Sequence, residues 1–168
     1  MSLRRLEAAD LPLVAGWLAT PDNAQWLDFG GGIQTLTPAA LAVMNQRDLH
    51  LLRLYSDSGG GSPVGIVALS NVSRAVGTAM LWYVLGDKAH GGRGVTTRAV
   101  SDLLGVGFGE LGLVAVNAWT VEHNLPSQRV LERNGFRFIG RQRACHVIAG
   151  RRYDRLLFDL VAGQHELV

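Results

Sequence analysis

A glycine-rich turn that carries one arginine lies near the middle of the chain, in the stretch "LGDKAHGGRGVTTRAV" at residues 85–100. Gly91, Gly92 and Gly94 leave the main-chain N–H groups of this turn unobstructed, and Arg93 adds a positive charge beside them. The turn follows an apolar run and precedes a segment with helical spacing. N–H groups at the start of a helix, together with the partial positive charge there, bind phosphate well. The residue types and their spacing therefore predict a phosphate or pyrophosphate site.

Two common phosphate-binding motifs do not account for this turn. The dinucleotide pattern G-x-G-x-x-G is absent, and no Gly-Lys-Ser or Gly-Lys-Thr follows, as a P-loop would require. Glycine-rich turns between a strand and a helix also occur for packing reasons. The turn alone thus leaves its ligand open, and the rest of the chain has to identify it.

A second motif, "NLPSQRVLERNGF", follows at residues 124–136. It matches the pattern Asn-x-x-Ser-x-x-Val-Leu-Glu-Lys/Arg-x-Gly-Phe, and with the glycine turn it makes the chain resemble the GNAT superfamily of acyl-CoA-dependent N-acyltransferases. The resemblance is greatest to the branch that contains the ribosomal-protein N-terminal acetyltransferases and related small-molecule enzymes. It covers residues 78–143 well, and the opening "LRRLEAADLPLVAGWL" fits the first strand and helix of the family.

Two residues of the turn depart from the family's pyrophosphate motif, which reads Arg/Gln-x-x-Gly-x-Gly/Ala. Gly91 stands where arginine or glutamine is usual, and Thr96 stands where glycine or alanine is usual. Gly91 keeps its N–H group, so a main-chain cradle is expected to survive. Thr96 adds a methyl group that could crowd a phosphate and a hydroxyl that could bond it. These departures keep a second class of function open, namely a non-catalytic CoA-binding sensor or partner module with the same fold.

The resemblance implies acetyl-CoA as the co-substrate, bound in the gap between two strands that splay apart. The pantetheine arm is expected to pair with main-chain groups of residues 83–85, and the pyrophosphate with the turn. The full set that the resemblance implies for cofactor binding is Tyr83, Val84, Leu85, Gly91, Gly92, Arg93, Gly94, Val95, Thr96, Thr97, Asn124, Ser127 and Arg133.

The resemblance also implies that the acceptor amine attacks the thioester directly, without a covalent enzyme intermediate. Ser127 is the candidate for protonating the departing thiolate or hydrogen-bonding it, because Leu131 stands where some members of the family have a tyrosine. Glu122 and His123 follow an apolar strand and are the candidate general bases. Histidine suits that task because its ordinary pKa is near neutral. A chain of water molecules is the alternative to a protein base.

The acceptor is expected to bind against the loop "PDNAQWLDFGGGIQT" at residues 21–35, where Trp26, Asp28 and Phe29 are the candidate substrate-binding residues. Its primary amine belongs either to a small molecule, such as an amino sugar, or to a protein N-terminus. A basic ribosomal N-terminus would need more acidic residues than the predicted acceptor loops contain, which slightly favours a small molecule.

The elements that position these residues follow from the hydrophobic pattern. Their predicted order is a strand, two helices, three strands in a meander, a helix, a strand, a helix and a final hairpin that turns at Ala149 and Gly150. Asp10 and Thr37 are expected to cap the first two helices, and residues 21–35 to form a long loop. The pattern predicts an α+β fold with a central mixed β-sheet and helices on both faces, and the resemblance implies that this fold is GNAT-like, with a splayed sheet.

Length and composition limit the remaining possibilities. The 168 residues are expected to form a single domain over positions 1–168. No apolar run reaches the roughly 18 residues of a membrane span, and no secretory signal is apparent. The single cysteine, Cys145, cannot form an internal disulfide, so a cytoplasmic location is expected. The scattered histidines have no metal-ligand spacing, and no metal is expected.

The charge distribution raises one further hypothesis. The formal net charge is only +2, but arginines gather between residues 137 and 155. Nucleic-acid binding is a distant third possibility on this ground, because a solvated strand face explains the cluster better. The apolar segment "LLFDLV" at residues 156–161 fits either a homodimer interface or a buried internal strand.

Overall fold

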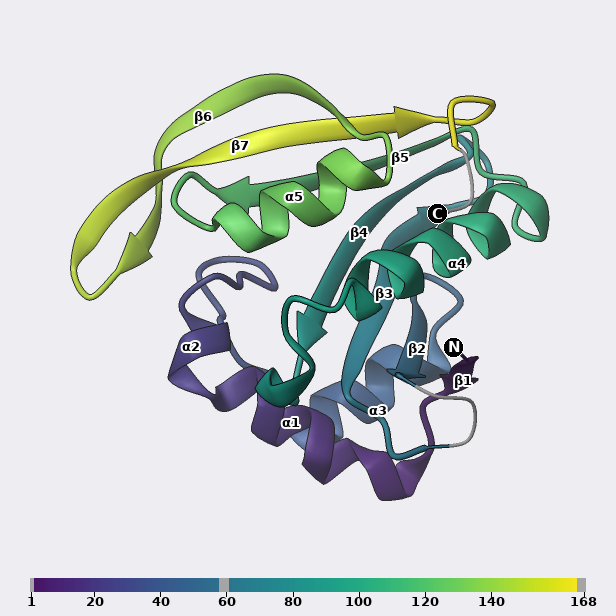
Figure 1. Ribbon diagram of the computed structural model, residues 1–168, viewed down its shortest axis with the longest axis horizontal. Helices are drawn as coiled ribbons and strands as arrows, with labels where there is room; N and C mark the ends of the chain where they lie inside the picture. Colours follow the sequence, from purple (N-terminus) through teal and green to yellow (C-terminus); the bar gives the residue numbers. More distant parts are fainter. Residues whose placement is uncertain (1, 58–60, 166–168) are drawn as a thin grey trace.

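The computed structural model describes residues 2–57 and 61–165, and its centre is a seven-stranded mixed sheet (Figure 1). The strand order is β1-β2-β3-β4-β5-β7-β6. Neighbouring strands are antiparallel except β4 and β5, which are parallel. The strands are β1 (Ser2–Arg5), β2 (Leu51–Ser56), β3 (Gly65–Ser73), β4 (Thr78–Leu85), β5 (Ala115–Val121), β6 (Arg137–Ile148) and β7 (Arg151–Val161).

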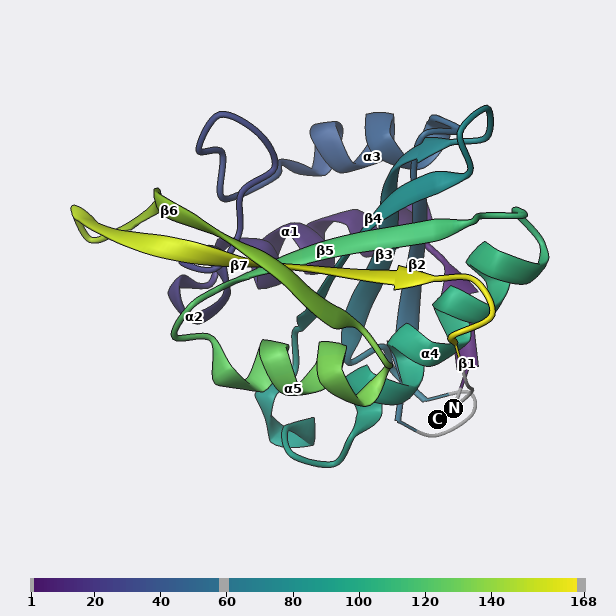
Figure 2. The ribbon, with the colours of Figure 1, turned by 90° about the horizontal axis from the view of Figure 1, so that it is seen from above.

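Helices cover both faces of this sheet (Figure 2). Helices α1 and α3 lie on one side, and α4 and α5 lie on the other. The helices are α1 (Leu11–Ala19), α2 (Pro21–Ala24), α3 (Pro38–Gln46), α4 (Val95–Gly109) and α5 (Leu125–Arg133), with single 3-10 turns η1 (Ala8–Asp10) and η2 (Lys88–His90). The predicted mixed α+β fold with helices on both faces is confirmed.

Strand β3 connects the two hydrophobic cores that result. Successive side chains of a strand point to opposite faces of the sheet. Ile66 accordingly packs in the core beneath α1 and α3, and Val67 packs in the core beneath α4 and α5. Both are fully buried. A strand buried on both faces needs a continuous apolar run rather than an alternating one, and "GIVAL" at residues 65–69 supplies it.

The two predicted helix caps have different outcomes. Thr37 caps α3, because its Oγ1 accepts a hydrogen bond from the N–H of Ala40 at 3.1 Å. Asp10 occupies the N-cap position of α1 as predicted, but its carboxylate makes no capping bond to that helix. It accepts instead from the N–H of Glu7 at 2.9 Å and pairs with Arg4 at 2.7 Å. The extra 3-10 turn η1 precedes α1 and takes over this carboxylate.

The predicted loop at residues 21–35 also needs correction. It begins with the short helix α2, which has Pro21 at its first position. The remainder is irregular and passes through three successive glycines with positive φ, at 118°, 59° and 85° for residues 30–32. Glycine adopts such angles without the steric penalty that other residues incur. The loop therefore bends back on itself, and the N–H of Phe29 bonds the carbonyl oxygen of Ile33 at 2.6 Å.

The parallel pair β4 and β5 separates after a short paired stretch. The register joins Thr78 to Ala115, Ala79 to Val116 and Met80 to Asn117, and no further pairs follow within the described strands. Beyond that point β4 stays paired with β3 as far as Leu85, and β5 stays paired with β7. The two strands diverge as a result, as Figure 1 shows. The predicted splay is present, and the candidate site lies in it.

Candidate active site

Two cavities meet in the splay between β4 and β5. We call the first the turn cavity: it has a volume of about 550 Å³ and is lined by the glycine turn and by α5. We call the second the loop cavity: it has a volume of about 600 Å³ and is lined by residues of the loop after α2. The residues that line both are Trp26, Leu27, Tyr83, Asn124 and Ser127. Molecules bound in the two cavities would therefore touch at the splay.

The glycine turn forms one end of the turn cavity. Gly94 is the N-cap of α4 and has a φ of 72°, and Gly92 has a φ of 76°. Since Gly94 has no side chain, none caps the first N–H groups of α4. A Cβ at Gly92 would meet nothing within 4 Å, so the space above the turn is open. The turn thus presents backbone donors and the positive end of a 15-residue helix to the cavity.

Thr96, which departs from the family motif, has a partner within the fold. Its Oγ1 lies 2.8 Å from the hydroxyl oxygen of Tyr55, a fully buried residue of β2. Burial raises the pKa of Tyr55, so its hydroxyl stays protonated and needs a partner. The other hydrogen bond of that hydroxyl, to the carbonyl oxygen of Val84, is long at 3.4 Å. The threonine at this position is therefore explained by a buried tyrosine that glycine or alanine would leave poorly bonded.

Cationic side chains from two elements surround the turn cavity. Lys88 on η2 lines it and donates to Oδ1 of Asn23, and Arg129 and Arg133 on α5 line it as well. Burial lowers the pKa of Lys88. Sequence analysis had identified Arg133 but not Arg129. The signal for Arg129 was its spacing of four residues, which puts both side chains on one face of the helix.

Arg93 is the one predicted cofactor-binding residue that lies outside the lining of the turn cavity. Its guanidinium instead approaches Asp57, with an N–O distance of 3.3 Å. Arg98 also approaches Asp57, at 3.6 Å. The side chain of Arg93 is therefore directed toward the carboxylate of Asp57 and not into the turn cavity.

Ser127 forms a hydrogen-bonded pair with Tyr83 where the two cavities meet. The hydroxyl oxygen of Tyr83 lies 2.8 Å from Oγ of Ser127 and 3.0 Å from the carbonyl oxygen of Ser127. A carbonyl oxygen only accepts, so Tyr83 donates to it and Ser127 Oγ can donate to Tyr83. Burial raises the pKa of Tyr83 and keeps it a neutral phenol. Asn124 caps α5, since its Oδ1 accepts from the N–H of Ser127 at 3.4 Å.

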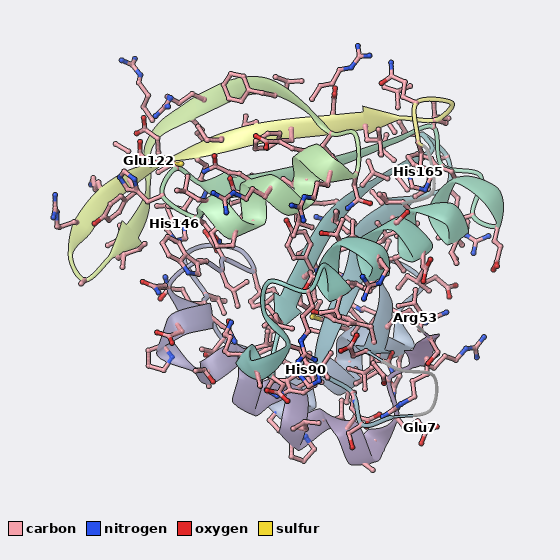
Figure 3. All side chains as sticks on the ribbon, viewed as in Figure 1. Glu7, Arg53, His90, Glu122, His146 and His165 are labelled. Carbon is pink, nitrogen blue, oxygen red and sulfur yellow. The ribbon has the colours of Figure 1, made fainter. Side chains whose placement is uncertain are left out.

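The candidate bases Glu122 and His123 do not line either cavity. Glu122 accepts from the N–H of Asp154 and from Arg141, both at 3.0 Å, on the side of the β6–β7 hairpin (Figure 3). These bonds, that from Asp154 first, lower the pKa of Glu122. The ring of His123 meets the ring of Tyr153 edge-on, with centroids 5.6 Å apart. Partners on the hairpin thus hold both side chains away from the splay.

The three candidate acceptor residues lie at the loop cavity. Trp26 lines both cavities, and Asp28 and Phe29 line the loop cavity. The ring of Phe29 packs edge-on against Trp82, with centroids 5.1 Å apart. The carboxylate of Asp28 accepts from the N–H groups of Gly30 at 2.8 Å and of Gly32 at 3.0 Å. This side of the splay is therefore walled by aromatic rings and by a carboxylate in a fixed position.

Arg155 lines the loop cavity, although sequence analysis did not assign it to the acceptor site. Its Nη2 donates to Oδ2 of Asp28 at 2.6 Å, across 127 positions of the chain. Its guanidinium lies over the ring of Trp119, 3.9 Å from the centroid. Burial raises the pKa of Asp28 and is outweighed by the bonds from Arg155 and the glycine N–H groups, so the pKa is lowered. In the sequence Arg155 was one arginine of a cluster, and only the fold distinguishes it.

Other arginines of that cluster have partners on the β6–β7 hairpin itself. Arg141 bonds Glu122 at 3.0 Å and Asp154 at 2.8 Å, and Arg152 donates to the carbonyl oxygen of Ala144 at 3.1 Å. Local pairing thus accounts for part of the basic segment.

No helix among the described residues is long and apolar enough to cross a membrane.

The fold is that of a GNAT acetyltransferase. The family model for the acetyltransferase (GNAT) domain matches residues 1–137, so the chain belongs to this family. The acetyltransferase class expected from the sequence is confirmed.

Particular relatives agree with this class. Over 74 residues the chain is 43% identical to the "Probable N-acetyltransferase YjcK" of Bacillus subtilis; the match covers 44% of this chain and 40% of that protein. The chain thus matches less than half of the length of that relative. Among solved structures, the spermidine N-acetyltransferase of Vibrio cholerae in complex with CoA and spermine has a TM-score of 0.84 at 16% identity, covering 97% of this chain and 96% of that one. The ribosomal-protein-S5-alanine acetyltransferase of Vibrio fischeri has a TM-score of 0.78 at 21% identity, covering 98% and 94%.

Proposed function

We propose that the protein transfers an acetyl group from acetyl-CoA to a primary amine, of a small molecule or of a protein N-terminus, by direct attack of the amine on the thioester. The observation that carries this proposal is the meeting of the turn cavity and the loop cavity at Tyr83, Asn124 and Ser127. Two substrates that enter from opposite sides of the sheet would touch there. Holding both reactants in contact removes much of the entropic barrier to a bimolecular reaction.

The turn cavity suits CoA. Its pyrophosphate would lie on the N–H groups at the start of α4, with Lys88, Arg129 and Arg133 as nearby cations. The pantetheine arm would lie along Tyr83, Val84 and Leu85, where β4 has lost its pairing with β5. An extended chain with amide groups can add to such an open strand edge, as an extra strand would.

Ser127 would act on the leaving group. The nitrogen of the amine attacks the thioester carbon, the carbon–sulfur bond breaks, and the thiolate takes a proton from Ser127 Oγ, which regains a proton from the water that receives the amine proton. The phenol of Tyr83 fixes the position of that hydroxyl. The amine nitrogen loses its proton to water, because neither Glu122 nor His123 lines the two cavities.

Calorimetric titration with acetyl-CoA, with ATP as the control, tests the first half of this proposal. We expect micromolar binding of acetyl-CoA and none of ATP, because ATP lacks the pantetheine arm that the splay would hold. Amine-dependent release of CoA thiol tests the second half. Binding without thiol release across a panel of primary amines would instead identify a non-catalytic CoA-binding module, and absence of binding would reject both functions.

A further inference from the structure

The charges of the loop cavity cancel each other. Among the described residues that line it, Asp28 and Arg155 are the two with permanently charged side chains. They form an ion pair with side chains only 15% and 14% exposed. His50 lines the cavity as well, and burial lowers its pKa, which favours its neutral form. The cavity therefore offers no unpaired charge to a substrate.

The arginine of this pair is held on three sides. Besides Asp28 and the ring of Trp119, it contacts His146, whose Nδ1 lies 3.0 Å from Nη2 of Arg155. His146 Nε2 lies 2.7 Å from the carbonyl oxygen of Gln25, which only accepts, so Nε2 carries the hydrogen. Nδ1 is then free to accept from Arg155. Figure 3 labels His146 on the side of the β6–β7 hairpin, and the bond to Gln25 ties this hairpin to the loop.

We propose that Arg155 determines acceptor specificity: by neutralising Asp28, it makes the site selective for weakly basic primary amines on uncharged bodies and unfavourable for polyamines. The inference rests on the proposed function, because it assumes that the loop cavity receives the acceptor. It gives the acceptor a chemical class that the two alternatives, a protein N-terminus and an amino sugar, both satisfy.

The physical reason is the cost of burying a charge without a partner. An ammonium group in this cavity would find each Asp28 oxygen already bonded, and burying an uncompensated charge is unfavourable. A polyamine would bring several such groups. An α-amine has a pKa near 7.7–8.0 and an alkyl amine near 10.4, so at pH 7.5 roughly a third of the first and about 0.1% of the second are neutral. The weakly basic amine thus arrives in the form that can attack.

The walls of the cavity agree with an uncharged body. Trp26, Phe29 and Trp82 supply aromatic surface, and Leu36 and Met44 supply aliphatic surface. Apolar and neutral groups gain free energy by leaving water for such surroundings. A polycation would lose its hydration there without gaining a counter-ion.

Comparison of kcat/KM among three acceptor amines tests the proposal. Acetyl-CoA binding is measured first by calorimetry, and kcat/KM is then determined at pH 7.5 for alaninamide, glucosamine and spermidine. We expect alaninamide or glucosamine to exceed spermidine at least tenfold, and the better of the two identifies the source of the amine. Loss of acetyl-CoA binding would overturn the proposed function, whereas normal binding with spermidine as the best acceptor would overturn this inference alone.

Substitution of Arg155 should reverse the preference. In R155M the carboxylate of Asp28 loses its cation, and we expect the ratio of kcat/KM for spermidine to that for alaninamide to rise at least tenfold. R155K keeps the charge and should keep the wild-type ratio. R152Q is the matched control. Arg152 is another arginine of β7, but it lines neither cavity, so this substitution should leave the ratio unchanged. An unchanged ratio in folded R155M would overturn the proposal.

A second substitution keeps the test decisive if R155M does not fold. D28N retains an oxygen for the N–H groups of Gly30 and Gly32 but leaves Arg155 as an uncompensated cation. We expect the spermidine-to-alaninamide ratio to fall below that of the wild type, opposite in direction to R155M. Equal ratios in D28N and the wild type would mean that the charge of this cavity does not select the acceptor.

Discussion

Thr96 lies in the first turn of α4, and its hydroxyl lies 2.8 Å from that of Tyr55, whose side chain packs in the core beneath the same helix. The same residue lines the turn cavity, so one side chain serves both the core and the proposed CoA site. Ser127 has a similar double position: its backbone carbonyl accepts from Tyr83 while its hydroxyl faces the meeting point of the two cavities. At the scale of single residues, therefore, the structural role of Thr96 or Ser127 can be distinguished from its proposed role at the site only by matched substitutions.

Removal of the Thr96 hydroxyl should lower stability through Tyr55. T96V keeps the shape of the side chain but takes away the short hydrogen bond to a buried phenol. We expect a loss of about 1–3 kcal/mol in the free energy of unfolding, the usual cost of an under-bonded buried polar group. Urea denaturation measures it. Adding Y55F to T96V should recover most of the loss, and a double variant as unstable as T96V would contradict this explanation.

Removal of the Ser127 hydroxyl should slow turnover without affecting the fold. In S127A the phenol of Tyr83 keeps the carbonyl oxygen of residue 127 as its acceptor, so we expect little change in stability. If Ser127 protonates the thiolate, kcat should fall about 10²-fold, within the range for a general acid. Steady-state thiol release gives kcat, and calorimetry gives the dissociation constant of acetyl-CoA, which should stay within about twofold of wild type. Unchanged kcat would exclude Ser127 from the mechanism.

At the scale of elements, the start of α4 and the divergence of β4 from β5 create the site together. The glycine turn brings the helix N-terminus to the same end of the sheet at which the strands separate. Parallel pairing over only three residue pairs leaves the distal part of β4 open toward β5. The hairpin of β6 and β7 then supplies Arg155 and His146 to the opposite side.

A substitution in the turn should affect CoA more than the fold. G92A places a methyl group in the open space above the turn and also forces alanine to a φ of 76°. G112A is the matched control, because Gly112 has a φ of 64°, open space around it and no place in either cavity. Both variants should lose about 1–2 kcal/mol through left-handed strain. G92A alone should raise the dissociation constant of acetyl-CoA, by tenfold or more in calorimetry; equal affinities would mean that the cradle lies elsewhere.

At the scale of the whole molecule, the buried His146 and the partly buried His50 and His165 link stability to pH. Burial is the main cause of the lowered pKa of His50, His146 and His165. In the unfolded chain each should titrate near 6.5. Between that value and the lower folded values the unfolded chain binds more protons, so stability rises with pH. The folded state therefore loses stability as the pH falls below about 6.5.

Urea denaturation at pH 7.5 and pH 5.5 tests this linkage. We expect a lower free energy of unfolding at pH 5.5, and a smaller decrease in H146Q, which removes one of the three groups. Stability that rises toward pH 5.5, or an undiminished decrease in H146Q, would contradict the assignment. Asp10, Asp28 and Asp154 have lowered pKa values, so their stabilisation should be lost only at still lower pH, as each becomes protonated.

The sequence by itself determined the parts of this protein that depend on local pattern. The apolar run of β3, the Thr37 and Asn124 caps, the hairpin turn at Ala149 and the glycine turn before α4 are each written within a few residues. They were enough to predict the order of elements, while the splayed sheet and the acetyltransferase family followed from the resemblance carried by the glycine turn and the motif at residues 124–136. The 3-10 turn that takes the carboxylate of Asp10 and the helix α2 were missed, because a 3-10 turn and a single helical turn leave almost no periodic signal.

Only the tertiary structure decided which distant side chains meet. Asp28 and Arg155 are 127 positions apart, and Gln25 and His146 are 121 apart. Their contact depends on how β7 registers against β5 and on where the loop after α2 folds back, and no local pattern encodes either. The same packing turned Glu122 toward Asp154 and Arg141 rather than toward the splay. The pairing of charged and polar side chains between the loop after α2 and the β6–β7 hairpin is a property of the assembled fold, because it joins residues that are far apart in the sequence.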